Sequence, residues 1–104
     1  MFHMIKPGPK DKKVSLLISG KELTELKRLA WLMSESFGLD SRIEHYQGTR
    51  PIGLYSWDFE CLLVVVNDAL RDRKTYPDTT ASGYQALAQL FSRLTDADRQ
   101  NFGG

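Results

Sequence analysis

The chain has 104 residues, 41% of them hydrophobic and 26% charged, a balance typical of a single soluble domain with its own core. Its apolar runs are far shorter than the roughly twenty residues that a membrane-spanning helix needs, so no membrane association is expected. The formal net charge is only +1, which argues against a dedicated nucleic-acid binder.

Residues 1–13 combine Pro7, Gly8 and Pro9 with four lysines and one aspartate, a composition that favours neither helix nor strand. We interpret this segment as a flexible basic arm with a charge of +3, which leaves −2 for a single globular domain over residues 14–104. The segment lacks the apolar core and cleavage site of a secretory signal, so a cytoplasmic protein is expected.

Apolar residues alternate along 14–18, with Val14, Leu16 and Ile18 on one side. This period of two predicts a short β-strand. Because a strand must pair its backbone groups, we expect it to bind either the segment 51–55 or the same strand of a second subunit.

A helix is predicted to begin at Ser19 and to run to about Phe37, where Gly38 ends it. Ser19 and Glu22 have the spacing of a capping box. Trp31 lies off the core-facing stripe, so it is either a packing contact for the following connector or an anchor for a partner. The predicted core stripe comprises Leu23, Leu26, Leu29, Ala30, Met33 and Phe37.

The connector 38–56 is the least regular interior segment, with one or two helical turns predicted over 41–46. Long connectors often carry function, but this one could equally serve only to cover the central helix. The sequence leaves both interpretations open. The candidate residues on the connector are Arg42, Glu44, His45, Tyr46, Arg50 and Tyr55.

The central helix is predicted over 57–73, with Ser56 as its N-cap and Pro77 beyond its end. A helical wheel separates two apolar groups, so the first half of this helix must be covered on both sides, by its own chain or by a second molecule. The core-facing group comprises Phe59, Leu62, Leu63, Val66, Ala69 and Leu70. The second apolar group comprises Trp57, Cys61, Val64 and Val65.

A third helix is predicted to begin between Asp78 and Ser82, and Thr95 has the character of an N-cap for a short final helix. The core stripe of the third helix comprises Tyr84, Leu87, Ala88, Leu90, Phe91 and Leu94. The expected fold is therefore mainly α, with three main helices, a short C-terminal helix and at most one small β element.

No pattern of catalytic or metal-binding residues stands out. Only two histidines are present, and no Cys or His pair has the spacing of metal ligands. A nucleophile–base pair of Cys61 and His45 is conceivable in space, but no sequence pattern indicates it, and Cys61 fits better as a small hydrophobe. We therefore expect no enzymatic activity, no cofactor and no metal.

The apolar surface that exceeds one core stripe favours a non-enzymatic protein-interaction module, which we expect to form a homodimer, with another protein as the alternative partner. The alternative is a small nucleic-acid-associated regulator that uses the lysine arm, with the 14–18 strand paired across a dimer. The candidate interaction residues are Trp31, Arg42, His45, Tyr46, Arg50, Tyr55, Trp57, Cys61, Val64 and Val65.

Overall fold

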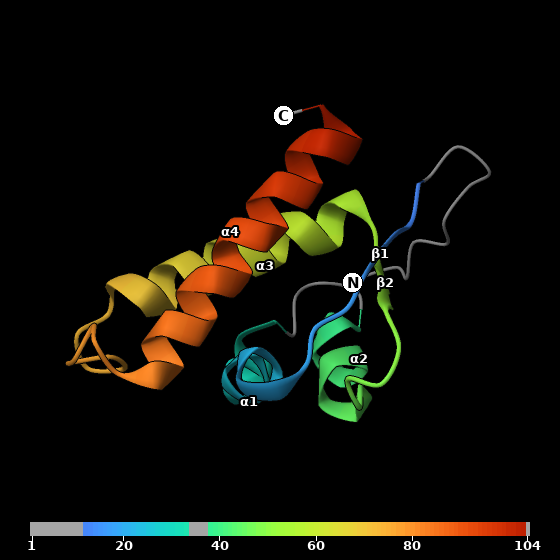
Figure 1. Cartoon of the computed structure of the whole chain (residues 1–104). Coiled ribbons are helices and arrows are strands. Elements are labelled where there is room, and N and C mark those ends of the chain that lie inside the picture. Colours follow the sequence, from blue (N-terminus) through green and yellow to red (C-terminus); the bar gives the residue numbers. More distant parts are fainter. Residues whose placement is uncertain (1–11, 34–37, 104) are drawn as a thin grey trace, which may run out of the picture.

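The computed structural model describes residues 12–33 and 38–103. The predicted mainly α fold with one small β element is confirmed (Figure 1). The elements are β1 (Val14–Leu16), α1 (Gly20–Arg28), the 3₁₀ helix η1 (Ala30–Met33), α2 (Leu39–His45), β2 (Ile52–Leu54), α3 (Ser56–Arg71) and α4 (Ser82–Phe102).

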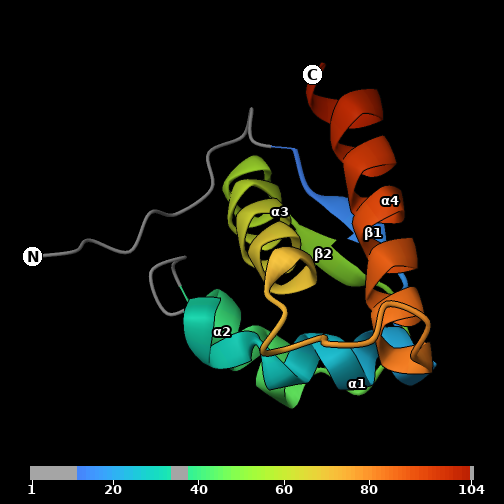
Figure 2. The same ribbon diagram turned by 90° about the vertical axis from the view of Figure 1, so that its left-hand side faces the viewer.

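The two longest helices, α3 and α4, pack against each other, and α1 lies across the lower side of this pair (Figures 1 and 2). The short elements η1 and α2 contact each other, and η1 also contacts α3. The 72–81 turn joins α3 to α4 and lies close to α1, so it brings two segments that are far apart in the sequence together.

One hydrophobic core joins all of these elements, and the predicted core stripes supply most of it. Five other predicted members are only partly buried, and they are Leu63, Leu70, Tyr84, Ala88 and Phe91, while Phe37 lies outside the described residues. The confirmed members of the predicted stripes are Leu23, Leu26, Leu29, Ala30, Met33, Phe59, Leu62, Val66, Ala69, Leu87, Leu90 and Leu94.

Strand β1 pairs antiparallel with β2, so that Val14 lies opposite Leu54 and Leu16 opposite Ile52. Of the two partners considered for this strand, the 51–55 segment is thus the one observed. The strand is shorter than predicted, because it ends at Leu16. Ile18 is nevertheless fully buried beyond the end of the strand.

Helix α1 begins directly after Ser19 as predicted, but the predicted capping box does not form. The Ser19 side chain makes no cap hydrogen bond, and Glu22 instead forms an ion pair with Arg93 of α4. The helix is also not continuous to Phe37. It ends at Arg28, and the chain tightens into η1 after a hydrogen bond from the amide of Leu29 to the carbonyl of Leu26.

Two boundaries near the other helices also differ from expectation. Helix α3 begins at Ser56 with Tyr55 as its N-cap, one residue earlier than predicted. The separate final helix from Thr95 is wrong, because α4 runs unbroken from Ser82 to Phe102. The Thr95 hydroxyl donates to the carbonyl of Phe91, one turn back in the same helix, and therefore does not cap a new one.

The connector approaches α1 closely at Gly48, whose φ of +74° favours glycine. A Cβ there would lie 2.9 Å from a methyl carbon of Leu23 and 3.1 Å from the carbonyl oxygen of Ile18.

Within residues 12–33 and 38–103, no helix is long and apolar enough to cross a membrane. Most of the predicted basic arm, residues 1–11, lies outside the described residues.

Candidate interaction site

The second apolar group of α3 is largely covered by the protein's own chain. The ring of Trp57 stacks on that of Tyr55, with centroids 4.8 Å apart and an interplanar angle of 13°. Cys61 and Val65 are partly buried and pack against the core, whereas Val64 is 60% exposed. The sequence thus predicted more uncovered apolar surface on this helix than the structure shows.

Two of the connector candidates hold the fold together. Arg42 donates from Nη1 to the Asp58 carboxylate at 3.0 Å, and from Nη2 to the carbonyl of Gly53, so it fastens α2 to α3 and β2. The Tyr46 hydroxyl donates to the carbonyl of Arg50 at 2.6 Å and accepts from the amide of Ile18 at 3.3 Å. These contacts favour a structural role for both side chains.

Of the remaining connector candidates, Glu44, His45 and Arg50 are exposed, and Tyr55 is half-buried where it stacks on Trp57. Nδ1 of His45 lies 2.8 Å from the carbonyl oxygen of Ser41 in the same helix. In the described parts of the chain, no group of three His, Cys, Asp or Glu side chains could hold a metal ion.

Trp31 is the most exposed large apolar side chain among the described residues, at 72%, and its neighbour Leu32 is 44% exposed. Both line a hollow of about 370 Å³ between η1, the end of α3 and the turn that follows. We call this feature the Trp31 hollow. Its lining residues are Arg28, Leu29, Trp31, Leu32, Ala69, Asp72, Thr75 and Tyr76.

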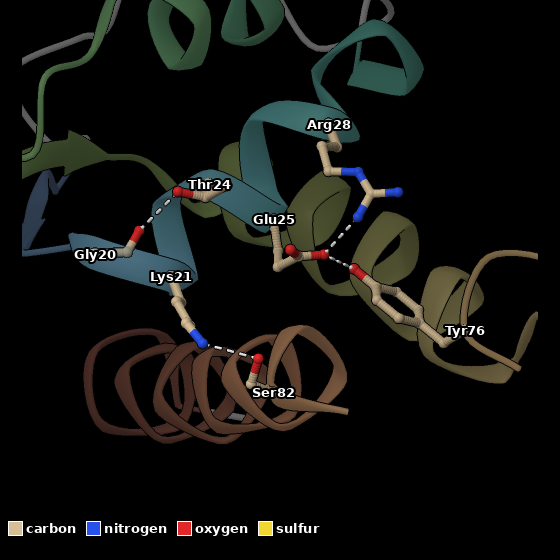
Figure 3. A network of polar contacts seen from close by, with 7 residues as sticks. All are labelled: Gly20, Lys21, Thr24, Glu25, Arg28, Tyr76 and Ser82. Carbon is tan, nitrogen blue, oxygen red and sulfur yellow. Dashed lines mark hydrogen bonds and ion pairs between the residues drawn. The ribbon is translucent and has the colours of Figure 1, made fainter. Parts of the chain in front are cut away.

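One wall of the Trp31 hollow is held by a polar network around Glu25 (Figure 3). Oε1 of Glu25 accepts from the Tyr76 hydroxyl at 2.5 Å and from Nη1 of Arg28 at 3.0 Å. On the other side of this wall lies a second hollow of about 300 Å³, beside Pro77 and Tyr84. Tyr76 is thereby fixed from α1 and cannot swing into either hollow without breaking a buried hydrogen bond.

The start of α4 approaches this network closely. A Cβ on Gly83 would lie 2.9 Å from Oε2 of Glu25, so a larger residue at this position would require that carboxylate to shift. Nζ of Lys21 donates to the hydroxyl of Ser82 at 2.8 Å, which adds a second link from α1 to α4 (Figure 3). The wall of the Trp31 hollow therefore rests on contacts between α1 and the segment 76–83, which are about fifty residues apart in the sequence.

Asp72 supplies the carboxylate of the Trp31 hollow, and its oxygens already have partners. Oδ2 accepts from the Thr75 hydroxyl at 2.8 Å, and Oδ1 accepts from the amide of Lys74 at 3.0 Å. The hydrogen bond from Thr75 is the main cause that lowers the pKa of Asp72 below its ordinary range. The carboxylate therefore stays ionised and shapes the turn.

From the environment of the Tyr76 hydroxyl we predict that the free energy of unfolding falls at high pH. Burial, followed by the hydrogen bond to Glu25, raises its pKa above the ordinary value of 10.0. Because the folded state then holds this proton more tightly than the unfolded state, its contribution is complete below about pH 10 and is lost as the pH rises toward the folded pKa.

Denaturation of the wild type and of Tyr76→Phe over a series of alkaline pH values measures this effect. We expect Tyr76→Phe to cost about 1–2 kcal/mol at neutral pH through the lost hydrogen bond, and to show a shallower loss of stability above about pH 10. An identical pH dependence in the two proteins would show that the Tyr76 hydroxyl is not protected by folding.

Sequence reasoning identified Trp31 in this site but missed Arg28, Asp72 and Tyr76. The available signals were weak: an aromatic residue in a polar turn before Pro77, and the run of charges from 71 to 74. Neither signal shows that this turn lies against η1, because that contact is made in the tertiary fold.

The fold and the site together define a small, mainly α domain with an exposed tryptophan beside a concave, largely apolar surface. Comparison of the chain with protein-family models, curated proteins and solved structures found no significant match. Function must therefore be inferred from the site.

Proposed function

We propose that this chain is a non-enzymatic protein-interaction module that binds its partner at the Trp31 hollow. The observation that carries the proposal is the 72% exposure of Trp31 beside a concave surface that also includes Leu29, Leu32 and Ala69. Tryptophan is enriched among the residues that dominate binding energy at protein interfaces. An exposed tryptophan beside an apolar hollow is thus better explained by a partner than by folding.

The exposed area is large enough for Trp31 to be a dominant contact in an interface. A tryptophan side chain buries roughly 150–250 Å² in a full contact, and most of that area is uncovered at Trp31. Covering the exposed part would contribute about 3–4 kcal/mol at about 25 cal/mol/Å². The neighbouring Leu32, also exposed, would add to this contribution.

The sequence-based prediction of a homodimer was founded on the second apolar group of α3. That group is mostly covered within the chain, so Val64 offers less exposed apolar surface to a partner than Trp31 does. Homodimerisation stays a prediction, which sedimentation of the purified chain at micromolar concentration tests. A purely monomeric chain would remove it. The cytoplasmic location expected from the sequence belongs to the same proposal.

The Trp31→Ala variant tests the proposed site. Tagged wild type and variant would be used to capture binding proteins from cells that express the chain, and we expect specific partners to fall at least about tenfold with the variant. Because Trp31 is 72% exposed, its loss should change the free energy of unfolding by less than about 1 kcal/mol.

Val64→Ala is the matched control, since Val64 is also exposed but lies on α3. It should leave capture of the same partners unchanged. Equal retention of every partner by Trp31→Ala and the wild type would contradict the proposal.

A further inference from the structure

The partner's chemistry can be inferred from the charges beside the Trp31 hollow. We propose that the hollow binds an acidic segment of another protein, with an apolar side chain of that segment in the hollow and a carboxylate on Arg28. This inference rests on the proposed function, because it uses the same surface. It adds the chemical class of the partner.

Arg28 has the hydrogen-bonding capacity that a carboxylate requires. Its side chain is 59% exposed and lines the hollow. Among the described residues, only its Nη1 has a partner, the Glu25 carboxylate, and the other terminal nitrogen points away from Glu25 (Figure 3). A guanidinium with free donors favours planar, paired recognition of a carboxylate.

The carboxylate in the hollow is by contrast held by its own turn. Each oxygen of Asp72 accepts a hydrogen bond from that turn, one from the Thr75 hydroxyl and one from the amide of Lys74. Arg28 is therefore the charged side chain of the hollow that brings unused donors to a ligand. A ligand that supplies acceptors fits this arrangement better than one that supplies donors.

Charge is concentrated in the two segments that border the hollow, 27–32 and 69–76. They carry five cationic side chains against one carboxylate, and Glu25, which pairs with Arg28, lowers the local net charge to +3 in a chain whose total is +1. All five of these cations are exposed, and they are Lys27, Arg28, Arg71, Arg73 and Lys74. Such a local excess attracts an acidic partner and increases the rate of association.

The same charge disfavours the symmetric pairing of two copies through this surface. An interface of that kind would bring one positive rim against another, which costs free energy unless anions intervene. The apolar lining, in turn, favours a protein side chain over a nucleic acid. Leu29, Leu32 and Ala69 form a recess that accepts an aliphatic or aromatic side chain, whereas phosphates need only the cations.

Selection of a random peptide library displayed on phage against the full chain tests the inference. We expect enriched peptides to combine Asp or Glu with a large apolar residue, and a labelled peptide from this set to bind less tightly as salt is raised. Replacing its acidic residues with Asn or Gln should weaken binding about tenfold.

Arg28→Gln should weaken the binding of the same peptide about tenfold. The control Arg99→Gln, at an exposed arginine on α4, should leave that binding unchanged. The Tyr76 hydroxyl still satisfies Glu25 in the Arg28 variant, so that variant should fold, which circular dichroism checks. Binding that is indifferent to Arg28→Gln would overturn the inference.

The other outcomes separate the two proposals. Peptides that require Trp31 but contain no acidic residues would overturn the inference and leave the proposed function standing. If every selected peptide still bound the Trp31→Ala variant, the result would count against both proposals. A labelled single-stranded oligonucleotide that binds more tightly than the peptides and displaces them through Arg28 would replace the protein partner with a nucleic acid.

Discussion

Replacing Phe59 with alanine should lower the free energy of unfolding by about 3–5 kcal/mol. Phe59 is fully buried in α3, and its ring contacts that of Phe102 near the end of α4, with centroids 5.7 Å apart. The substitution leaves a cavity where the two longest helices meet. Because small domains are stable by only about 5–15 kcal/mol, the variant should be largely unfolded at temperatures that the wild type withstands.

Urea denaturation followed by circular dichroism measures this loss. Val64→Ala is the control on the same helix, because Val64 is 60% exposed and should change stability by less than about 0.5 kcal/mol. A similar midpoint for both variants would mean that the packing of α3 on α4 does not determine the stability of the fold.

Replacing Asp58 with alanine should cost about 2–4 kcal/mol at neutral pH. This carboxylate is fully buried, and its Oδ2 accepts from the amide of Tyr55 at 2.9 Å and from Nη1 of Arg42 at 3.0 Å. Its loss removes the cap at the start of α3 and the counter-ion of Arg42. The cost is limited because the Arg42 side chain is 36% exposed and keeps its hydrogen bond to the carbonyl of Gly53.

The control is Asp68→Ala, an exposed carboxylate on the same helix, which should change stability by less than about 0.5 kcal/mol. In a double-mutant cycle, Asp58→Ala and Arg42→Met together should cost less than the sum of the two single changes, because either one already breaks the ion pair. Strict additivity would show that the pair contributes nothing beyond its separate residues.

The helices and their core faces could be predicted from the sequence because periodicity and burial are local properties of each segment. Leu26, Leu62 and Leu90 lie on stripes that any helical wheel reveals, and all three are fully buried. The strand partner of β1 could be narrowed to two candidates but not chosen, since antiparallel pairing within the chain and across a dimer require the same strand pattern.

The details that failed depend on side chains that meet across the tertiary fold. Glu22 has the position of a capping-box residue, but Arg93 lies 71 residues further along the chain and takes its carboxylate instead. Asp58 has the sequence position of a residue that complements the helix dipole, and the structure shows that Arg42 allows it to be buried. No local pattern contains either partner.

The candidate site shows the same limit. The off-stripe position of Trp31 marked it as an interaction candidate, yet the hollow beside it is formed by the distant turn that contains Asp72 and Tyr76. The reverse error occurred on α3, where a helical wheel cannot show that Tyr55 stacks on Trp57 or that Cys61 and Val65 pack inward.

The most direct test of the proposed docking surface is photo-crosslinking from position 31. A photoreactive phenylalanine analogue would replace Trp31 in one protein and Val64 in another, and both would be irradiated in cells that express the chain. The proposal predicts a discrete crosslinked partner from position 31 that position 64 does not give, although both positions are exposed. No crosslink from position 31, or the same products from both positions, would contradict it.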